Sequence, residues 1–144
     1  MLTIEESVTI ERPRHDVFEF FADPDNVAVY SSNIVDYEIV SGEPDQVGRK
    51  AKFAVKVVGV RLDYTDEMVE RVQDERAKLV SRDGKIPYAI TLSFSDKGSG
   101  THVSWMQEVE SLGNVFKFAD GLVMKMYGRD VRSNLEKAKT LLEG

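Results

Sequence analysis

From residue 34 to residue 109, the chain alternates apolar and polar side chains and is interrupted only by short turn segments. The alternation is clearest in RKAKFAVKVVG (residues 49–59), where Phe53, Val55 and Val57 oppose Lys52 and Lys56. A period of two is typical of strands that bury one face. Strands of this kind joined by short turns predict an antiparallel meander, whose apolar face must be covered by another element.

Segments before and after this run supply the remaining elements. Residues 3–11 alternate as another strand, and Pro13 and Pro24 each stand at the start of a short predicted helix. Residues from about 112 to 143 predict one long helix, which is the only element able to cover the sheet. We therefore expect a single domain over residues 1–144, with an α+β fold of two layers.

The first half of the long helix is more apolar than a single core-facing stripe requires. At about 100° per residue, the apolar side chains from Val115 to Tyr127, except Met124, cover roughly 180°. From Val131 onward the apolar set is narrower, and its centre is turned by roughly 120°. The sheet can cover only one side of the first half, so that half needs a second cover.

Three covers are consistent with the sequence. The first is core packing against the two short helices, whose Val17, Phe18, Phe20 and Phe21 need a partner. The second is a ligand cavity between helix and sheet, which Met124 and Met126 slightly favour because Met adapts to irregular apolar surfaces. The third is a partner subunit in a homodimer. Core packing and a cavity can coexist.

Composition narrows the classes of function. The 144 residues are 42% hydrophobic and 31% charged, as in a soluble globular protein. No apolar run approaches the roughly 20 residues that span a bilayer, and no secretory signal is visible, so we predict a cytoplasmic protein without stable membrane insertion. The net charge of −6 argues against nucleic acid as a partner. With no cysteine and two histidines, we predict no metal and no cofactor.

Several polar side chains are candidates for chemistry inside such a cavity. These are Tyr37, Tyr64, Tyr88, Tyr127 and Gln107, with Asp66 and Asp130 as acids. A tyrosine hydroxyl could donate to a substrate carbonyl, and a buried carboxylate with a raised pKa could act as a base. A half-buried tyrosine in a sheet, however, usually only packs its ring, and Asp66 belongs to an acidic run that we predict to face solvent. His15 and His102, both expected to be exposed, have no nucleophile beside them, so no catalytic residue is assigned.

Three stretches resemble a known family: SVTIERPRHDVFEFFADPDNVAVYSSNI, SGEPDQVGRKAKF and the terminal helix. With the strand order, they resemble the START-like superfamily (SRPBCC or helix-grip proteins) and, within it, the bacterial polyketide cyclase/dehydrase and lipid-transport group. The resemblance covers essentially the whole chain. It implies a curved antiparallel sheet of about seven strands wrapped around a long C-terminal helix, with two short helices after the first strand and an apolar cavity inside.

Members of this superfamily include lipid and hormone carriers and aromatic polyketide cyclases. The leading prediction is therefore a protein that binds a hydrophobic or aromatic small molecule, lipid- or polyketide-like, between the sheet and the C-terminal helix. The alternatives are a polyketide cyclase/dehydratase-type enzyme and a ligand-free regulatory or interaction module. In relatives the second short helix commonly ends near a Trp, whereas this chain has Tyr30, which we expect at the cavity mouth. The predicted ligand-binding residues are Tyr30, Phe53, Val55, Tyr64, Met68, Tyr88, Ile90, Trp105, Gln107, Phe116, Val123, Met126 and Tyr127.

Overall fold

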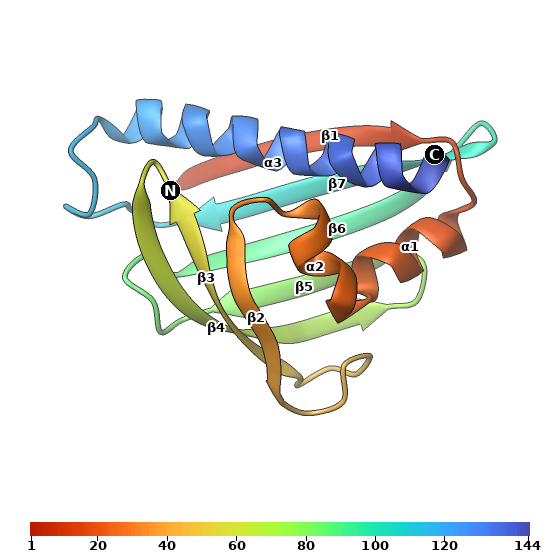
Figure 1. Cartoon of the computed structure of the whole chain (residues 1–144), viewed down its shortest axis with the longest axis horizontal. Helices are drawn as coiled ribbons and strands as arrows, with labels where there is room; N and C mark the ends of the chain where they lie inside the picture. Colours follow the sequence, from red (N-terminus) through yellow and green to blue (C-terminus); the bar gives the residue numbers. More distant parts are fainter.

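The computed structural model describes residues 1–144 and contains one seven-stranded antiparallel sheet and three helices (Figure 1). The elements follow in the order β1 (Leu2–Ile10), α1 (Arg14–Ala22), α2 (Pro24–Tyr30), β2 (Ile34–Ser41), β3 (Lys50–Val57), β4 (Val60–Val72), β5 (Arg76–Ser81), β6 (Tyr88–Lys97), β7 (Gly100–Val109) and α3 (Asp120–Glu143). The sheet order is β1-β7-β6-β5-β4-β3-β2. This architecture confirms the predicted helix-grip fold.

The sheet is strongly curved, and all three helices lie on its concave side (Figure 1). α3 runs along β1 and β7 at one edge, whereas α1 and α2 cover the concave face beyond β7. The strands bury the face that their alternation predicts: in β3, Phe53, Val55 and Val57 are buried, and Lys52 and Lys56 are exposed. The apolar side chains of seven strands therefore converge on one interior.

α1 and α2 pack onto the sheet, and α2 also contacts α3. Pro24 stands in the first turn of α2, and the Asp23 side chain caps that helix by accepting a hydrogen bond from the backbone N–H of Asp25 at 2.9 Å. The ring of Phe18 lies edge-on to Phe94 of β6, and Phe21 contacts both Phe94 and Tyr30. The aromatic side chains of α1 thus find partners in β6 and α2, and cover of residues 115–127 by the short helices stays a prediction.

α3 begins at Asp120, eight residues after the predicted start at residue 112. Gly113 has a φ of +58°, a conformation that a helix cannot contain, and Ala119 is extended at the helix N-cap. Residues 112–119 thus form a loop that packs Leu112, Val115 and Phe116 against the core independently of helical phase. Counting these residues as helical turns produced the apparent second apolar face.

From Asp120 onward, α3 buries one continuous stripe. Val123, Val131, Leu135 and Ala138 are buried, and Tyr127 is half-buried on the same side. Met124 lies at the border of this stripe and packs against the core, although its phase appeared to exclude it. Met126 lies on the opposite side and is exposed, as are Phe118 and Leu122. A homodimer formed through these exposed side chains stays a prediction.

Polar contacts fix α3 along its length. Arg132 pairs with Glu6 of β1 at 3.2 Å, and the Lys139 ammonium donates to the Thr9 carbonyl at 2.6 Å. Near the helix end, the Glu143 carboxylate accepts from the Glu11 backbone N–H at 2.8 Å. These links hold the helix against β1 at the sheet edge. None of the three helices combines the length and apolar character needed to cross a membrane.

Candidate ligand-binding cavities

The first cavity, called the α3 cavity here, lies between the concave sheet and the first half of α3. Eighteen of its 22 lining residues are hydrophobic, and its empty volume, including open solvent at its mouth, is about 750 Å³. Leu112 and Phe116 come from the loop before α3, and Val57 and Leu62 come from the β3–β4 hairpin. Small-molecule sites are commonly apolar clefts with a few polar groups. The α3 cavity has that character.

Most of the predicted ligand-binding residues meet in this cavity. The ten that line it are Phe53, Val55, Tyr64, Tyr88, Ile90, Trp105, Gln107, Phe116, Val123 and Tyr127. Tyr30 and Met68 line a different cavity, and Met126 lines neither. Tyr30 is almost fully buried against Phe20 and Phe21, so it does not stand at an open mouth. Met124, which the helical phase left out, takes the place expected for Met126 in the wall.

Several polar groups of the α3 cavity already have protein partners. The Tyr64 hydroxyl donates to the Ile86 carbonyl at 2.9 Å, and Trp105 Nε1 donates to Gln107 Oε1 at 3.2 Å. Burial raises the pKa of Tyr64 well above its ordinary value and that of Tyr127 to about 12. These phenols are therefore neutral at physiological pH, and the cavity carries no formal charge on its tyrosines.

The second cavity, called the α1–α2 cavity here, lies beneath the two short helices. Fourteen of its 19 lining residues are hydrophobic, and its empty volume with open solvent is about 780 Å³. Phe18, Phe21 and Tyr30 line it from the helices, Leu79 from β5 and Phe94 from β6. Ser31, Ile34, Ile90 and Trp105 line both cavities. The two cavities are thus neighbours that share part of a wall.

Two charged side chains lie buried in the wall of the α1–α2 cavity. Arg49 is 7% exposed and Asp66 is 4% exposed. Arg49 Nη1 donates to the Tyr37 hydroxyl at 2.7 Å, and the Tyr88 hydroxyl donates to Asp66 Oδ2 at 3.3 Å. Arg49 Nε and Asp66 Oδ1 have no hydrogen-bond partner in the protein. Each charge is therefore only partly satisfied.

Local backbone features bring these groups together. Asp36 has a φ of +57°, and the register between β2 and β3 shifts by one residue beside it, so the Tyr37 ring lies 5.7 Å from that of Phe53. Gly42 has a φ of +81°, and a Cβ there would lie 2.8 Å from the Cα of Arg49. Only glycine fits this turn, which holds the β2–β3 connection against the start of β3.

The expectation that Asp66 faces solvent is wrong. It alternates in phase with Leu62, Tyr64 and Met68 of β4, all buried, so strand parity places it inside. Burial raises its pKa from 3.8 to about 6, and the positive charge of Arg49 moderates this rise. Arg49 was not identified from the sequence at all, although it shares the inward parity of Phe53. Of the remaining candidates, Asp130 lines neither cavity, and burial raises its pKa.

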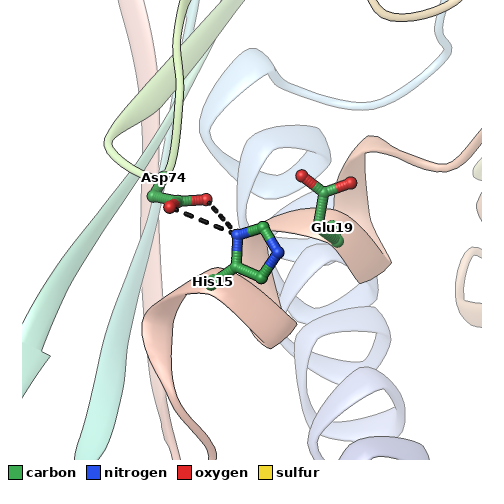
Figure 2. Close-up of side chains that lie close together, drawn as sticks. All are labelled: His15, Glu19 and Asp74. Atoms are coloured by element: carbon green, nitrogen blue, oxygen red, sulfur yellow. Dashed lines mark hydrogen bonds and ion pairs between the residues drawn. The ribbon is translucent and has the colours of Figure 1, made fainter.

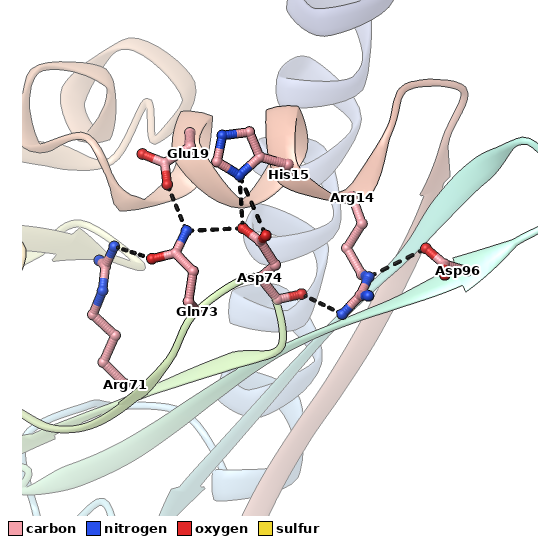
Figure 3. A network of polar contacts seen from close by, with 7 residues as sticks. All are labelled: Arg14, His15, Glu19, Arg71, Gln73, Asp74 and Asp96. Carbon is pink, nitrogen blue, oxygen red and sulfur yellow. Dashed lines mark hydrogen bonds and ion pairs between the residues drawn. The ribbon is translucent and has the colours of Figure 1, made fainter.

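A separate polar cluster lies on the surface, between α1 and the β4–β5 turn. His15, Glu19 and Asp74 offer ligand atoms that lie within 4.8 Å of one another (Figure 2). His15 Nδ1 lies 3.0 Å from Asp74 Oδ1, and the Gln73 amide donates to both Glu19 and Asp74 (Figure 3). The carboxylates are thus already engaged by protein donors, and the cluster attaches α1 to the sheet.

His15 is exposed as expected, and Arg14 extends the same network. The Arg14 guanidinium donates to the Asp74 carbonyl at 3.0 Å and pairs with Asp96 of β6 at 3.2 Å (Figure 3). Asp74 raises the pKa of His15, chiefly through their hydrogen bond. His102, also expected at the surface, is half-buried on β7, and its Nδ1 has no partner.

Comparison with solved structures finds the same fold in proteins of low sequence identity. A protein from Thermus thermophilus is 19% identical, with a TM-score of 0.84, over 98% of this chain and 97% of its own. A START superfamily protein from Mycobacterium smegmatis is 12% identical, with a TM-score of 0.80, over 98% and 97%. The major latex-like protein 151 of Panax ginseng is 16% identical, with a TM-score of 0.79, over 99% and 98%. These likenesses show a shared fold.

Curated protein sequences gave no match. A family model described as "Polyketide cyclase / dehydrase and lipid transport", in contrast, matches residues 1–143. The match extends from β1 to the end of α3 and so includes both cavities and every strand that lines them. The chain is therefore a member of the polyketide cyclase/dehydrase and lipid transport family.

Proposed function

We propose that this protein binds a hydrophobic or aromatic small molecule, lipid- or polyketide-like, in the α3 cavity. The observation that carries the proposal is the lining itself, an apolar wall with four polar residues: Ser31, Asn33, Gln107 and Asn134. Burial of apolar ligand surface in such a site contributes roughly 25 cal/mol per Å². Shape and apolar area, rather than a charge, would then determine affinity.

The hydrogen bonding inside the cavity supports binding over catalysis. The Tyr64 hydroxyl is committed to the Ile86 carbonyl, and Gln107 Oε1 is committed to Trp105. A group that must donate to a substrate as charge develops would first have to leave its protein partner. These two polar atoms therefore help to hold the shape of the wall.

The experiment is a titration with N-phenyl-1-naphthylamine, a neutral apolar probe. Trp105 is the only tryptophan and lines the cavity, so its emission can transfer energy to the bound probe. The expected result is saturable quenching of Trp105 with a stoichiometry of one. Native mass spectrometry of freshly purified protein would identify any molecule retained from the cell.

A matched pair of variants locates the probe. Val123→Phe fills the cavity from α3, and Leu141→Phe makes the same kind of change at an exposed position of the same helix. We expect Val123→Phe to weaken probe binding at least about tenfold and Leu141→Phe to leave it unchanged. Overpacking can destabilise a core by about 1–3 kcal/mol, so both variants are first checked by thermal unfolding. Equal binding by both folded variants would contradict the proposal.

A cyclase/dehydratase-type enzyme is the second candidate, and one observation favours it. Asp66 has a pKa of about 6, near the range in which a general base works best, and its Oδ1 has no partner. Incubation with a linear poly-β-ketone chain, followed by mass spectrometry for loss of water, tests this candidate. Turnover that Asp66→Asn abolishes while probe binding persists would establish the enzyme over the carrier.

A further inference from the structure

The α1–α2 cavity contains an unusual pair of buried charges. The backbones of Arg49 and Met68 are joined by a hydrogen bond from the Met68 N–H to the Arg49 carbonyl at 3.0 Å, so Asp66 is the diagonal neighbour of Arg49 on the same sheet face. Diagonal neighbours lie about 7–8 Å apart. Both side chains are more than nine-tenths buried and line the same cavity.

These two charges do not form an ion pair with each other. The eight ion pairs within 4.0 Å involve other residues. Arg49 Nε, a donor, and Asp66 Oδ1, an acceptor, are both buried and unpartnered. Leaving such atoms unpaired costs about 1–3 kcal/mol each, and more for charged groups. The two orphan atoms therefore leave a donor and an acceptor for a third group to bridge.

We propose that the α1–α2 cavity is a second binding site, which takes a neutral small molecule with an apolar, aromatic body and a polar end that both accepts and donates a hydrogen bond. The acceptor of the ligand receives the Arg49 Nε–H, and its N–H or O–H donates to Asp66 Oδ1. A primary amide or a hydroxy ketone carries this pair of groups. The proposal concerns a different cavity from the proposed function and stands independently of it.

The surrounding residues determine the two other properties of the ligand. Phe18, Phe21, Tyr30 and Phe94 line the cavity beside the charges, and aromatic walls favour a flat apolar body. The site already contains one cation and one anion, so an ionic ligand would leave one buried charge uncompensated. A neutral ligand with a matched donor and acceptor avoids this cost.

The test compares three probes at pH 8, where Asp66 is ionised because its pKa is about 6. 2-Naphthamide offers both an acceptor and a donor, methyl 2-naphthoate offers an acceptor only, and 2-ethylnaphthalene offers neither. Methyl NMR locates each probe, since Val27 and Leu79 line only the α1–α2 cavity and Leu62 and Val123 line only the α3 cavity. We expect 2-naphthamide to shift Val27 and Leu79 and to bind there at least about tenfold more tightly than the ester.

The Asp66→Asn variant tests whether Asp66 causes the preference for 2-naphthamide over methyl 2-naphthoate. Tyr88 would donate to the Asn oxygen as it does to Asp66 Oδ2, which leaves the Asn amide NH₂ as a donor in the place of the unpartnered Oδ1. The variant should lose the preference for 2-naphthamide and bind the ester at least as tightly. Asp63→Asn, an exposed position on the same strand, should keep the wild-type order.

Two results would overturn the inference. One is equal affinity of the amide and the ester at Val27 and Leu79, which would mean that water alone bridges the two charges. The other is an unchanged preference in a folded Asp66→Asn protein. Shifts at Leu62 and Val123 with 2-ethylnaphthalene report on the α3 cavity instead, so failure of the two proposals can be told apart.

Discussion

The α3 cavity and the α1–α2 cavity lie in the same concave sheet, and their empty volumes with open solvent included are about 750 and 780 Å³. Both are mainly apolar, and both use Ile90 and Trp105 as wall. They differ in their polar atoms. In the first, the Tyr64 hydroxyl and the Gln107 carbonyl oxygen are engaged by the protein; in the second, Arg49 and Asp66 each keep an unpartnered atom.

Because the two cavities are alike in apolar lining, only their polar atoms could distinguish a general apolar site from a selective one. Buried polar groups in folded proteins are almost always paired, so an unpaired one calls for an explanation. A wall whose polar atoms are satisfied can discriminate ligands only by shape and size. A wall with a free donor and a free acceptor can also discriminate by chemistry, because the wrong ligand leaves both unpaired.

The largest expected effect is at Arg49. Arg49→Met removes the bond to the Tyr37 hydroxyl and leaves Asp66 buried without its neighbouring cation. Breaking a buried ion pair typically costs roughly 3–5 kcal/mol, because it leaves one buried charge uncompensated. Arg49 and Asp66 lie farther apart than an ion pair, so we expect a loss of up to about that size in the free energy of unfolding, measured with urea at pH 8. Lys50→Met, at the exposed next residue, is the control. A loss below about 1 kcal/mol would show that the two charges do not interact.

Removing the charge of Asp66 should raise the stability of the protein, whereas removing the charge of Arg49 should lower it. Its folded pKa, about 6, lies above the ordinary 3.8, so the folded state favours the protonated form. The contribution of Asp66 to the free energy of unfolding is fully present below pH 3.8 and is lost as the pH rises through the folded pKa of about 6. The pKa difference corresponds to about 3 kcal/mol. Asp66→Asn, which stays neutral, should therefore gain up to about 3 kcal/mol at pH 8 and show a flatter stability profile between about pH 4 and 6. Asp63→Asn should gain nothing.

A hydroxyl in the α3 cavity should matter less. Tyr64→Phe keeps the ring and removes the bond to the Ile86 carbonyl, which should cost about 0.5–1.5 kcal/mol of stability. Affinity for an apolar probe should change by less than about tenfold, because the hydroxyl is not available to the ligand. Tyr88→Phe makes the same change next to Asp66 and should also move the pH dependence of stability upward. If Tyr64→Phe and Tyr88→Phe gave the same dependence of stability on pH, the two hydroxyls would not differ in their effect on Asp66, and the contrast between the cavities would be lost.

The smallest expected effect is in the surface cluster that holds α1 over the α1–α2 cavity. The pKa of His15 is raised above 6.5, so its contribution is present below that pH and is lost as pH rises through the folded pKa. Desolvation acts to raise the pKa of Asp74, but hydrogen bonds with Gln73 and His15 outweigh it and lower that pKa below 3.8, so the contribution of Asp74 is lost at more acid pH. His15→Ala should therefore reduce stability most between about pH 4 and 6.5. An equal reduction at pH 9 would mean that the ionic contact is not the cause.

The sequence predicted the sheet, the order of elements and most of the α3 cavity, because strand alternation determines which side chains face inward. The same parity places Asp66 beside Tyr64 and Arg49 in phase with Phe53, but the charge of these residues suggested a solvated face. Met126 and Met124 exchanged roles because the apolar arc was centred with residues 115–119 counted as helical, whereas α3 begins only at Asp120, after the left-handed Gly113. The division into two cavities could not be predicted, since it depends on how Trp105 and its neighbours meet across a curved sheet.

The pairing of β1 with β7 has a consequence for how the molecule assembles. Leu2 is opposite Val109, so the earliest strand to be synthesised finds its partner only after about a hundred further residues have been made. The entropy of closing so long a loop makes this pairing slow relative to the local hairpins from β2 to β7. α3, which packs along β1, is synthesised later still, and until it docks the part of the concave face along β1 and β7 stays open to water. The α3 cavity is thus completed last, and the partly folded chain is most prone to aggregation immediately before that step.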